Sequence, residues 1–244
     1  NVIEARVGEA FGNIVGYKYK RAPDGQKIVN ENGGYNREER QSILGNINPD
    51  WTGGLNNTFS YKGLSMNVLL DFVQGGQLTS LTRYYMTMKG TGAWTVEGRR
   101  PVATDANGNQ MPYVGVLDGV VEIKDADGNV TGYEKNTKAV PGQTYWANRA
   151  WSRIGEEFVM DASYISLREV VLSYSFPKSI IGKTPFSALS LSVIGRNLMY
   201  IKEHMKGTGV SPESQPNTAM GAAGIEALAL PPTRTYGLNV NITF

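Results

Sequence analysis

Apolar and polar side chains alternate without a break along the segment 234–244. Because successive side chains of a β-strand point to opposite faces, this alternation predicts a strand with one apolar and one polar face. Its length matches the roughly 9–11 residues that a tilted strand needs to cross a bilayer. We expect the apolar face to consist of Tyr236, Leu238, Val240, Ile242 and Phe244.

Two classes of β-protein contain strands of this kind. A strand of an outer-membrane barrel turns its apolar side toward lipid and its polar side toward the lumen, with aromatic residues at both interfaces. A strand of a soluble β-sandwich also alternates, because one side packs against a second sheet. The closing segment fits both classes equally well, so the remainder of the chain must distinguish them.

The same alternation recurs earlier in the chain. It predicts further strands over residues 10–20, 53–62, 64–72, 162–176 and 187–199. Lys62-Gly63 separates two of these strands, and glycine permits the positive φ of a tight turn, so the pair is expected to form a hairpin. The segment 74–160 has little strand pattern and contains only a candidate helix and a small hairpin, over residues 77–89 and 120–133.

The faces of the predicted strands differ in chemistry. In the strand 64–72, Asp71 lies on the same side as Ser65 and Asn67, which suits a wet lumen better than the core of a sandwich. In the strand 162–176, the alternation assigns Tyr164 and Arg168 to the apolar side. We expect Arg168 to lie near the loop end of its strand, where a barrel strand has left the hydrocarbon.

The connections between the predicted strands alternate in length. The connections 62–63 and 177–186 are short, whereas 21–52, 74–160 and 200–232 are long. A membrane barrel predicts this alternation, since short periplasmic turns lie on one rim and long extracellular loops on the other. A sandwich gives no reason for it. The pattern therefore favours an all-β fragment of a transmembrane antiparallel barrel whose C-terminus is periplasmic.

Composition narrows the possible functions further. The chain of 244 residues has 29 Gly, 13 Tyr and no Cys, which excludes disulfides, thiolate metal sites and cysteine nucleophiles. Its 24 basic and 22 acidic residues leave a net charge of +2, so no basic surface for nucleic acid is expected. It also lacks an apolar run of about 18 residues, which excludes a transmembrane helix but not a barrel strand.

The predicted strands are too few for a complete barrel. About six are expected here, whereas the smallest membrane barrels have about eight. The chain begins at Asn1 without a methionine or a signal peptide. We therefore interpret it as the C-terminal portion of a longer protein, which pairs at both sheet edges with strands outside this sequence.

Four runs of residues, 48–63, 161–177, 192–198 and 231–244, resemble motifs of one family, the SusC/RagA-type TonB-dependent outer-membrane transporters. The run from Asn48 to Gly63 resembles their strand-opening motif, and the run from Asp161 to Pro177 resembles their D-A-S-Y-L-R-L-R-N-V-x-L-x-Y segment. Residues 192–198 are similar to a further strand of the family, and 231–244 to its closing strand. Ser211-Pro-Glu213 lies where the family usually has Asp-Pro-Glu, with Ser in place of Asp.

This resemblance implies much that the residues alone do not. The family has a barrel of about 22 strands around an N-terminal plug, and it imports oligosaccharides or oligopeptides with energy from TonB. A SusD-like lipoprotein covers the extracellular side. The resemblance therefore implies a place in the bacterial outer membrane, contact with lipid, and as partners the lipoprotein, TonB and the remaining barrel and plug segments. The plug and the TonB-binding segment are not part of this sequence.

Candidate catalytic and metal-binding residues are few. Asp125-Ala-Asp-Gly-Asn129 is similar to the start of a calcium loop, but the glycine and glutamate that an EF-hand needs at its sixth and twelfth positions are Val130 and Asn136. We interpret this segment, and likewise 105–109, as a turn. His204 is the only histidine, and we expect it in a solvated loop. No enzyme activity and no cofactor are predicted.

The aromatic residues of the segment 74–160 are the best candidates for binding. Aromatic faces stack on sugar rings, anchor protein interfaces and also fill the cores of folded loops. All three roles remain open for Trp94, Tyr113, Tyr145, Trp146 and Trp151. The leading hypothesis is thus an importer whose long extracellular loop 74–160 presents these aromatics to the lipoprotein or the ligand. An outer-membrane adhesin or a soluble glycan-binding sandwich is the alternative.

Overall fold

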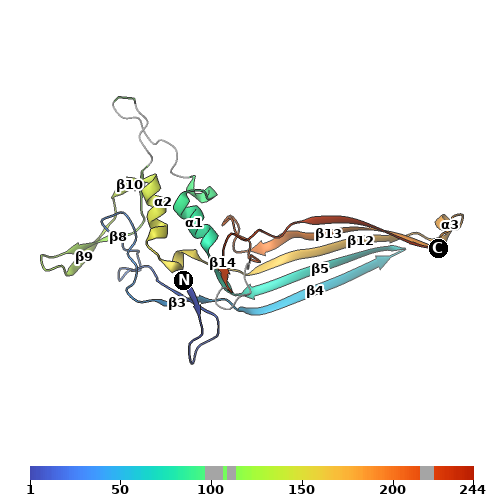
Figure 1. The fold of residues 1–244 in the computed structure, drawn as a ribbon, viewed down its shortest axis with the longest axis horizontal. Coiled ribbons are helices and arrows are strands. Elements are labelled where there is room, and N and C mark those ends of the chain that lie inside the picture. Colours follow the sequence, from blue (N-terminus) through green and yellow to red (C-terminus); the bar gives the residue numbers. More distant parts are fainter. Residues whose placement is uncertain (97–106, 109–113, 215–222) are drawn as a thin grey trace.

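The structure, a computed structural model, describes residues 1–96, 107–108, 114–214 and 223–244. It consists of one sheet of long strands and a group of short elements at one end of it (Figure 1). We call this group the head; it comprises the described residues of 1–48, 76–163 and 204–234. The C-terminus lies at the opposite end of the sheet.

The long sheet has five antiparallel strands, in the order β15-β13-β12-β5-β4. Each strand pairs with its neighbour in the chain, so the sheet is a meander with β4 and β15 at its edges. No second sheet packs on it within the part of the chain that the structure describes, so these residues do not form a sandwich. The strands are β4 (Pro49–Tyr61), β5 (Leu64–Gly75), β12 (Tyr164–Ser175), β13 (Ala188–Glu203) and β15 (Thr235–Thr243).

The register places side chains of the same kind next to one another on neighbouring strands, across the whole sheet. One row is apolar and exposed on every strand: Leu238, Val193, Leu172, Met66 and Phe59. The adjacent row, on the opposite side, is polar: Asn239, Ser192, Ser173, Ser65 and Ser60. We call the two sides the apolar face and the polar face. The predicted alternation along 234–244 is thus confirmed, and it continues through the neighbouring strands.

Short and long connections lie at opposite ends of the sheet. Lys62 and Gly63 join β4 to β5 with φ values of 48° and 86°, the positive pair that a tight hairpin turn needs. The connection from β12 to β13 is also short and holds the helical turn α3 (Lys178–Ile181). Both connections lie at the end with the C-terminus, and the long connections lead into the head (Figure 1).

The expected strand 10–20 is not part of the long sheet. Only Asn13–Gly16 is extended there, as β2, and all four residues are buried between β1 (Val2–Glu4) and β3 (Ser42–Asn46). This short run is covered on both sides, so the alternation that marks a one-sided strand does not apply to it. The long sheet therefore has one strand fewer than expected.

Two further small sheets and a hairpin complete the strands of the head. The strand β6 (Gln77–Ser80) lies between β11 (Val159–Asp161) and β14 (Ile225–Glu226). A second pair joins β7 (Val114–Val116) to β10 (Ala139–Pro141). The predicted hairpin is confirmed as β8 (Val120–Lys124) and β9 (Val130–Lys135), which projects from the head (Figure 1).

Two helices of the head lie side by side, α1 (Leu81–Lys89) and α2 (Gly142–Trp151). The helix predicted over 77–89 begins later than expected, because residues 77–80 form β6 and the hydroxyl of Ser80 caps α1 by accepting from the backbone N–H of Arg83. The helix α2 was not predicted. Single 3₁₀ turns follow each helix, η1 (Ala93–Thr95) and η2 (Gly155–Phe158). No helix among the described residues is long and apolar enough to span a membrane.

The head has a hydrophobic core of its own, in contrast to the long sheet. Its largest cluster joins the first loop to the segment after α2 and consists of Tyr19, Val29, Tyr35, Leu117 and Ile154. A second cluster, Leu78, Ala162 and Met205, fixes β6 to the two segments that enter and leave the sheet. Segments far apart in the chain are thereby held together at one end of the sheet.

Candidate functional site

A β-bulge in β12 changes which side chains lie on the polar face. Leu167 pairs with Leu70 and Glu169 with Leu69, so that Arg168 is an extra residue without a partner on β5. Such a bulge shifts the alternation by one residue. Tyr164 and Arg168 therefore lie on the polar face beside Asp71, and the prediction that both belong to the apolar side is wrong.

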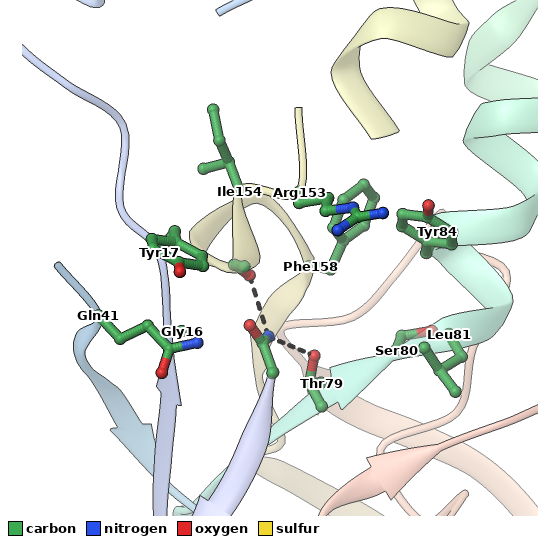
Figure 2. Close-up of a pocket in the computed structure, with 12 residues that line it drawn as sticks. Gly16, Tyr17, Gln41, Thr79, Ser80, Leu81, Tyr84, Arg153, Ile154 and Phe158 are labelled. Carbon is green, nitrogen blue, oxygen red and sulfur yellow. Dashed lines mark hydrogen bonds between the residues drawn. The ribbon is translucent and has the colours of Figure 1, made fainter. Parts of the chain in front are cut away.

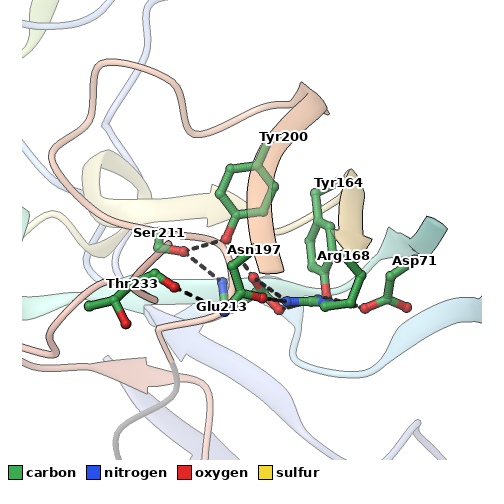
Figure 3. Close-up of polar contacts among 8 residues, drawn as sticks. All are labelled: Asp71, Tyr164, Arg168, Asn197, Tyr200, Ser211, Glu213 and Thr233. Carbon is green, nitrogen blue, oxygen red and sulfur yellow. Dashed lines mark hydrogen bonds and ion pairs between the residues drawn. The ribbon is translucent and has the colours of Figure 1, made fainter. Parts of the chain in front are cut away.

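Arg168 is the centre of a charged network at the junction of the sheet and the head (Figure 3). Its Nη2 atom lies 2.6 Å from Oδ2 of Asp71, and it also pairs with Glu213 from the segment after β13. The hydroxyl of Tyr164 donates to Glu213 at 3.3 Å, and Oδ1 of Asn197 accepts from Nη1 of Arg168 at 3.0 Å. One guanidinium is thus shared by two carboxylates, each only partly exposed.

The same network contacts the segment 204–234 at two places, residues 211–213 and Thr233. Tyr200 on β13 donates from its hydroxyl to Glu213 at 2.6 Å and lies 2.8 Å from the hydroxyl of Ser211. Further along the segment, Nδ2 of Asn197 donates to the backbone oxygen of Thr233 at 3.1 Å. The sequence singled out residues 211–213 by resemblance only; their pairing with Arg168, more than forty positions away in the chain, was not predicted.

The predicted loop aromatics lie in the head but in different surroundings. Tyr145 packs against the largest core cluster, and Trp146 meets it edge to face at 5.1 Å. The ring of Trp94 lies 4.2 Å below the guanidinium of Arg83 and donates to Thr87. Trp151, at the end of α2, is 65% exposed.

These placements differ in burial, which bears on the core role alone of the three roles that the sequence left open. Tyr145 has a core role, whereas Trp151 presents a large aromatic surface to solvent. Tyr113 lies outside the described residues.

A hollow of about 340 Å³ lies in the head between the end of α2 and the start of α1 (Figure 2). Its apolar wall contains Tyr84 and Phe158, which meet edge to face at 5.3 Å. Across the hollow, Nδ2 of Asn1 donates to Oγ1 of Thr79 at 2.7 Å and to the backbone oxygen of Gly155 at 3.2 Å. The remaining residues that line it are Gly16, Tyr17, Gln41, Ser80, Leu81, Arg153 and Ile154.

Behind one wall of this hollow lies a buried group of tyrosines and charges. Burial raises the pKa of Tyr35 to about 12, and burial together with the nearby carboxylate of Glu157 raises the pKa of Tyr19 strongly. Lys27 lies 3.7 Å from the centre of the Tyr19 ring, and its own burial lowers its pKa. Arg149 pairs with Glu157 at 2.8 Å. The carboxylate of Glu157 is thus already engaged by Tyr19 and Arg149, and it is not among the residues that line the hollow.

The minor candidate sites are structural. Oδ1 of Asp125 accepts from the backbone N–H of Asp127 and of Asn129, which confirms the turn between β8 and β9. His204 is not simply solvated: its Nδ1 pairs with the carboxylate of Asp161, and both side chains are partly exposed. Among the described residues, no three carboxylate or imidazole side chains are grouped in the way that a metal site requires. Of 105–109, only 107–108 are described.

Known proteins resemble this chain in sequence and in fold. No family model matches the chain. It is 26% identical, over 98% of its own length, to TonB-dependent receptor P3 of Formosa agariphila. The chain is therefore similar to one TonB-dependent receptor over almost its whole length. It spans only 23% of the length of this relative.

Solved structures agree on the fold of these receptors. The chain is similar to structures of the RagAB peptide importer in its closed-closed and open-open states, with TM-scores of 0.56 and 0.57 at 14% and 13% identity. Each match covers 96% of this chain and 23% of the importer chain. None of these names describes an enzyme. The resemblance to SusC/RagA-type proteins that the motifs indicated is thus supported by a relative and by the fold.

Proposed function

We propose that the chain is the C-terminal part of an outer-membrane transporter that imports oligopeptides or oligosaccharides with energy derived from TonB. The observation that carries the proposal is the pair of adjacent rows across the long sheet, one apolar and exposed on all five strands and one polar. A single-layered sheet with these two faces fits a barrel wall between lipid and a wet lumen. It does not fit a water-soluble protein, which rarely leaves so large an apolar surface bare.

Both edges of the sheet also support this proposal. β4 and β15 are each paired on one side only among the described residues. An open edge cannot lie in lipid, because its backbone N–H and C=O groups would lack partners. The remaining strands of the transporter therefore pair with β4 and β15. With short connections on the periplasmic rim, the C-terminus is periplasmic and the head is extracellular.

The head is the proposed docking site for a SusD-like surface lipoprotein. Of the described loop aromatics, Trp151 offers the largest exposed surface, and exposed tryptophans are common anchors of protein interfaces. Deleting residues 90–150 would not test this cleanly, because it would remove Leu117 and Val140 from the interior of the head. A single substitution, Trp151→Ala, keeps that interior intact.

The test is affinity purification of the tagged transporter from outer membranes of its host, followed by mass spectrometry. We expect a SusD-like lipoprotein in the wild-type sample and clearly less of it with Trp151→Ala. Tyr133→Ala, which removes a half-exposed aromatic from the projecting hairpin, is the matched control. Equal recovery of the lipoprotein with all three proteins would contradict docking at Trp151. Recovery of the protein from the soluble fraction would contradict the transporter itself.

A further inference from the structure

Arg153 is the charged side chain that lines the hollow between α1 and α2, and no carboxylate is among the lining residues. It makes no ion pair or hydrogen bond through its side chain with any residue that the structure describes. The neighbouring arginines differ in this respect, since Arg21 pairs with Glu156 and Arg149 with Glu157. A solvent-exposed guanidinium with no counter-ion among the described residues thus borders a partly enclosed space (Figure 2).

The backbone at Arg153 is also unusual. Arg153 follows the C-cap of α2 with a φ of 54°, in the left-handed region. Helices commonly end with a residue in this conformation, but the residue is usually glycine, because a side chain there costs roughly 1–2 kcal/mol. Strained non-glycine residues often belong to functional sites. This sequence has an arginine at the position, where glycine would adopt the turn without this cost.

The rest of the lining limits what could bind there. Tyr84, Phe158 and Leu81 supply an apolar wall. Gln41 and the hydroxyl of Tyr17 add neutral polar groups that have no hydrogen-bond partner among the described residues. An apolar cavity with a few polar groups in fixed positions is the common form of a small-ligand site. A planar guanidinium matches a carboxylate, which it can bind through two parallel hydrogen bonds.

We propose that this hollow binds a carboxylate group of the transported ligand, with Arg153 as the anion-binding residue and the aromatic wall against the adjoining part of the ligand. The inference rests on the proposed transport function and narrows the substrates to those that carry a carboxylate. Two sources share this chemistry: the C-terminal carboxylate of an oligopeptide and the uronate of an acidic oligosaccharide. Sequence analysis missed Arg153, because nothing in its local pattern distinguishes it from a solvated arginine.

The experiment measures binding to the whole transporter, purified in detergent together with any partner that co-purifies. Four probes are compared by calorimetry: acetyl-leucyl-phenylalanine, its C-terminal amide, trigalacturonate and neutral maltotriose. Arg153→Gly removes the guanidinium and suits the left-handed backbone, so it is expected to fold at least as well as the wild type. Arg153→Lys keeps the charge without the planar fork. Arg234→Gln, which removes an exposed arginine outside the hollow, is the control.

We expect one carboxylate probe to bind and its neutral counterpart to bind about tenfold more weakly, as for the loss of a hydrogen-bonded charge. Arg153→Gly should reduce binding of the acidic probe by about the same factor and leave the neutral probe unchanged. The affinity of Arg153→Lys for the acidic probe should lie between those of the wild type and Arg153→Gly. The affinity of Arg234→Gln should match that of the wild type. Which acidic probe binds identifies the source of the carboxylate.

Two outcomes would overturn the inference. Equal affinity of the wild type and Arg153→Gly for the acidic probe would show that the guanidinium does not hold the carboxylate. Binding of neutral probes only would exclude the proposed ligand class. Neither outcome affects the proposed transport function, which is tested separately by membrane location and co-purification of the lipoprotein.

Discussion

The long sheet and the head place their apolar side chains in opposite ways. In the sheet, Leu238 is 69% and Phe59 58% exposed, whereas in the head Leu117 and Ile154 are each 1% exposed. The head therefore buries its apolar surface within itself, as a soluble domain does. The sheet leaves its apolar surface for another medium to cover. The two regions therefore suit different surroundings: water for the head and, on the proposed function, lipid for the apolar face of the sheet.

The strongest test of this comparison is to separate the chain from the rest of the proposed transporter. Expressed alone, residues 1–244 should not give a monomeric folded sheet in water or in detergent, because both edge strands would lack partners. Size-exclusion chromatography with circular dichroism is the measurement, and aggregation is the expected result. A stable, soluble monomer with the full strand content would contradict the barrel interpretation.

A substitution in the head tests whether its core is independent. Leu117→Ala in the whole transporter should destabilise the head by roughly 2–5 kcal/mol, the usual cost of a cavity at a buried leucine. Limited proteolysis should then cut the head while the barrel stays folded in membranes. Ile123→Ala, at a 43% exposed position on the hairpin, is the matched control and should leave the cleavage pattern unchanged. Loss of the barrel along with the head would show that the two regions fold as one unit.

A substitution in the last strand tests the two faces of the sheet. Val240 lies beside Leu191 on the apolar face, and Asn239 beside Ser192 on the polar face. A charge on the lipid side costs up to roughly 2–4 kcal/mol near the midplane for lysine or arginine, and less for aspartate. Val240→Asp should therefore leave far less folded protein in outer membranes than Asn239→Asp. Similar yields of the two variants, measured by heat-modifiable mobility on gels, would reverse the assignment.

The smallest expected effect is at the junction between the two regions. A double-mutant cycle of Arg168→Gln and Glu213→Gln should give a coupling of about 1–3 kcal/mol, since this pair is partly buried and hydrogen-bonded. The more exposed pair of Arg196 and Glu169 should give less than about 1 kcal/mol. Both coupling energies are measured by urea unfolding of the transporter in detergent, with proteolysis within 204–234 as the readout. Equal couplings would mean that the junction network does not hold the segment.

The sequence predicted the sheet far better than the head, and the difference has a physical cause. The strands expected over 64–72, 162–176 and 234–244 lie within a few residues of the observed ones, because each has one wet and one apolar side along its whole length. The fully buried β2 has no such alternation.

The remaining failures concern contacts between distant segments. The bulge at Arg168 is a single extra residue that no local pattern marks, so Tyr164 and Arg168 were assigned to the wrong face. The partners of Arg168 come from β5 and from the segment after β13, and only the folded chain brings them together. Arg153 was missed for the same reason, since its hollow is assembled from five separate stretches of the chain.

The bulge in β12 also sets the result of any thiol-labelling scan along this strand. The chain contains no cysteine, so each cysteine introduced here is the single reactive thiol in this stretch of the protein. A water-soluble maleimide should label position 168 and then positions 169, 171 and 173, which lie partly exposed on the polar face, whereas 164 and 166 are buried by the head. The switch from even to odd would locate the extra residue to a single peptide unit, by chemistry alone and in the intact membrane.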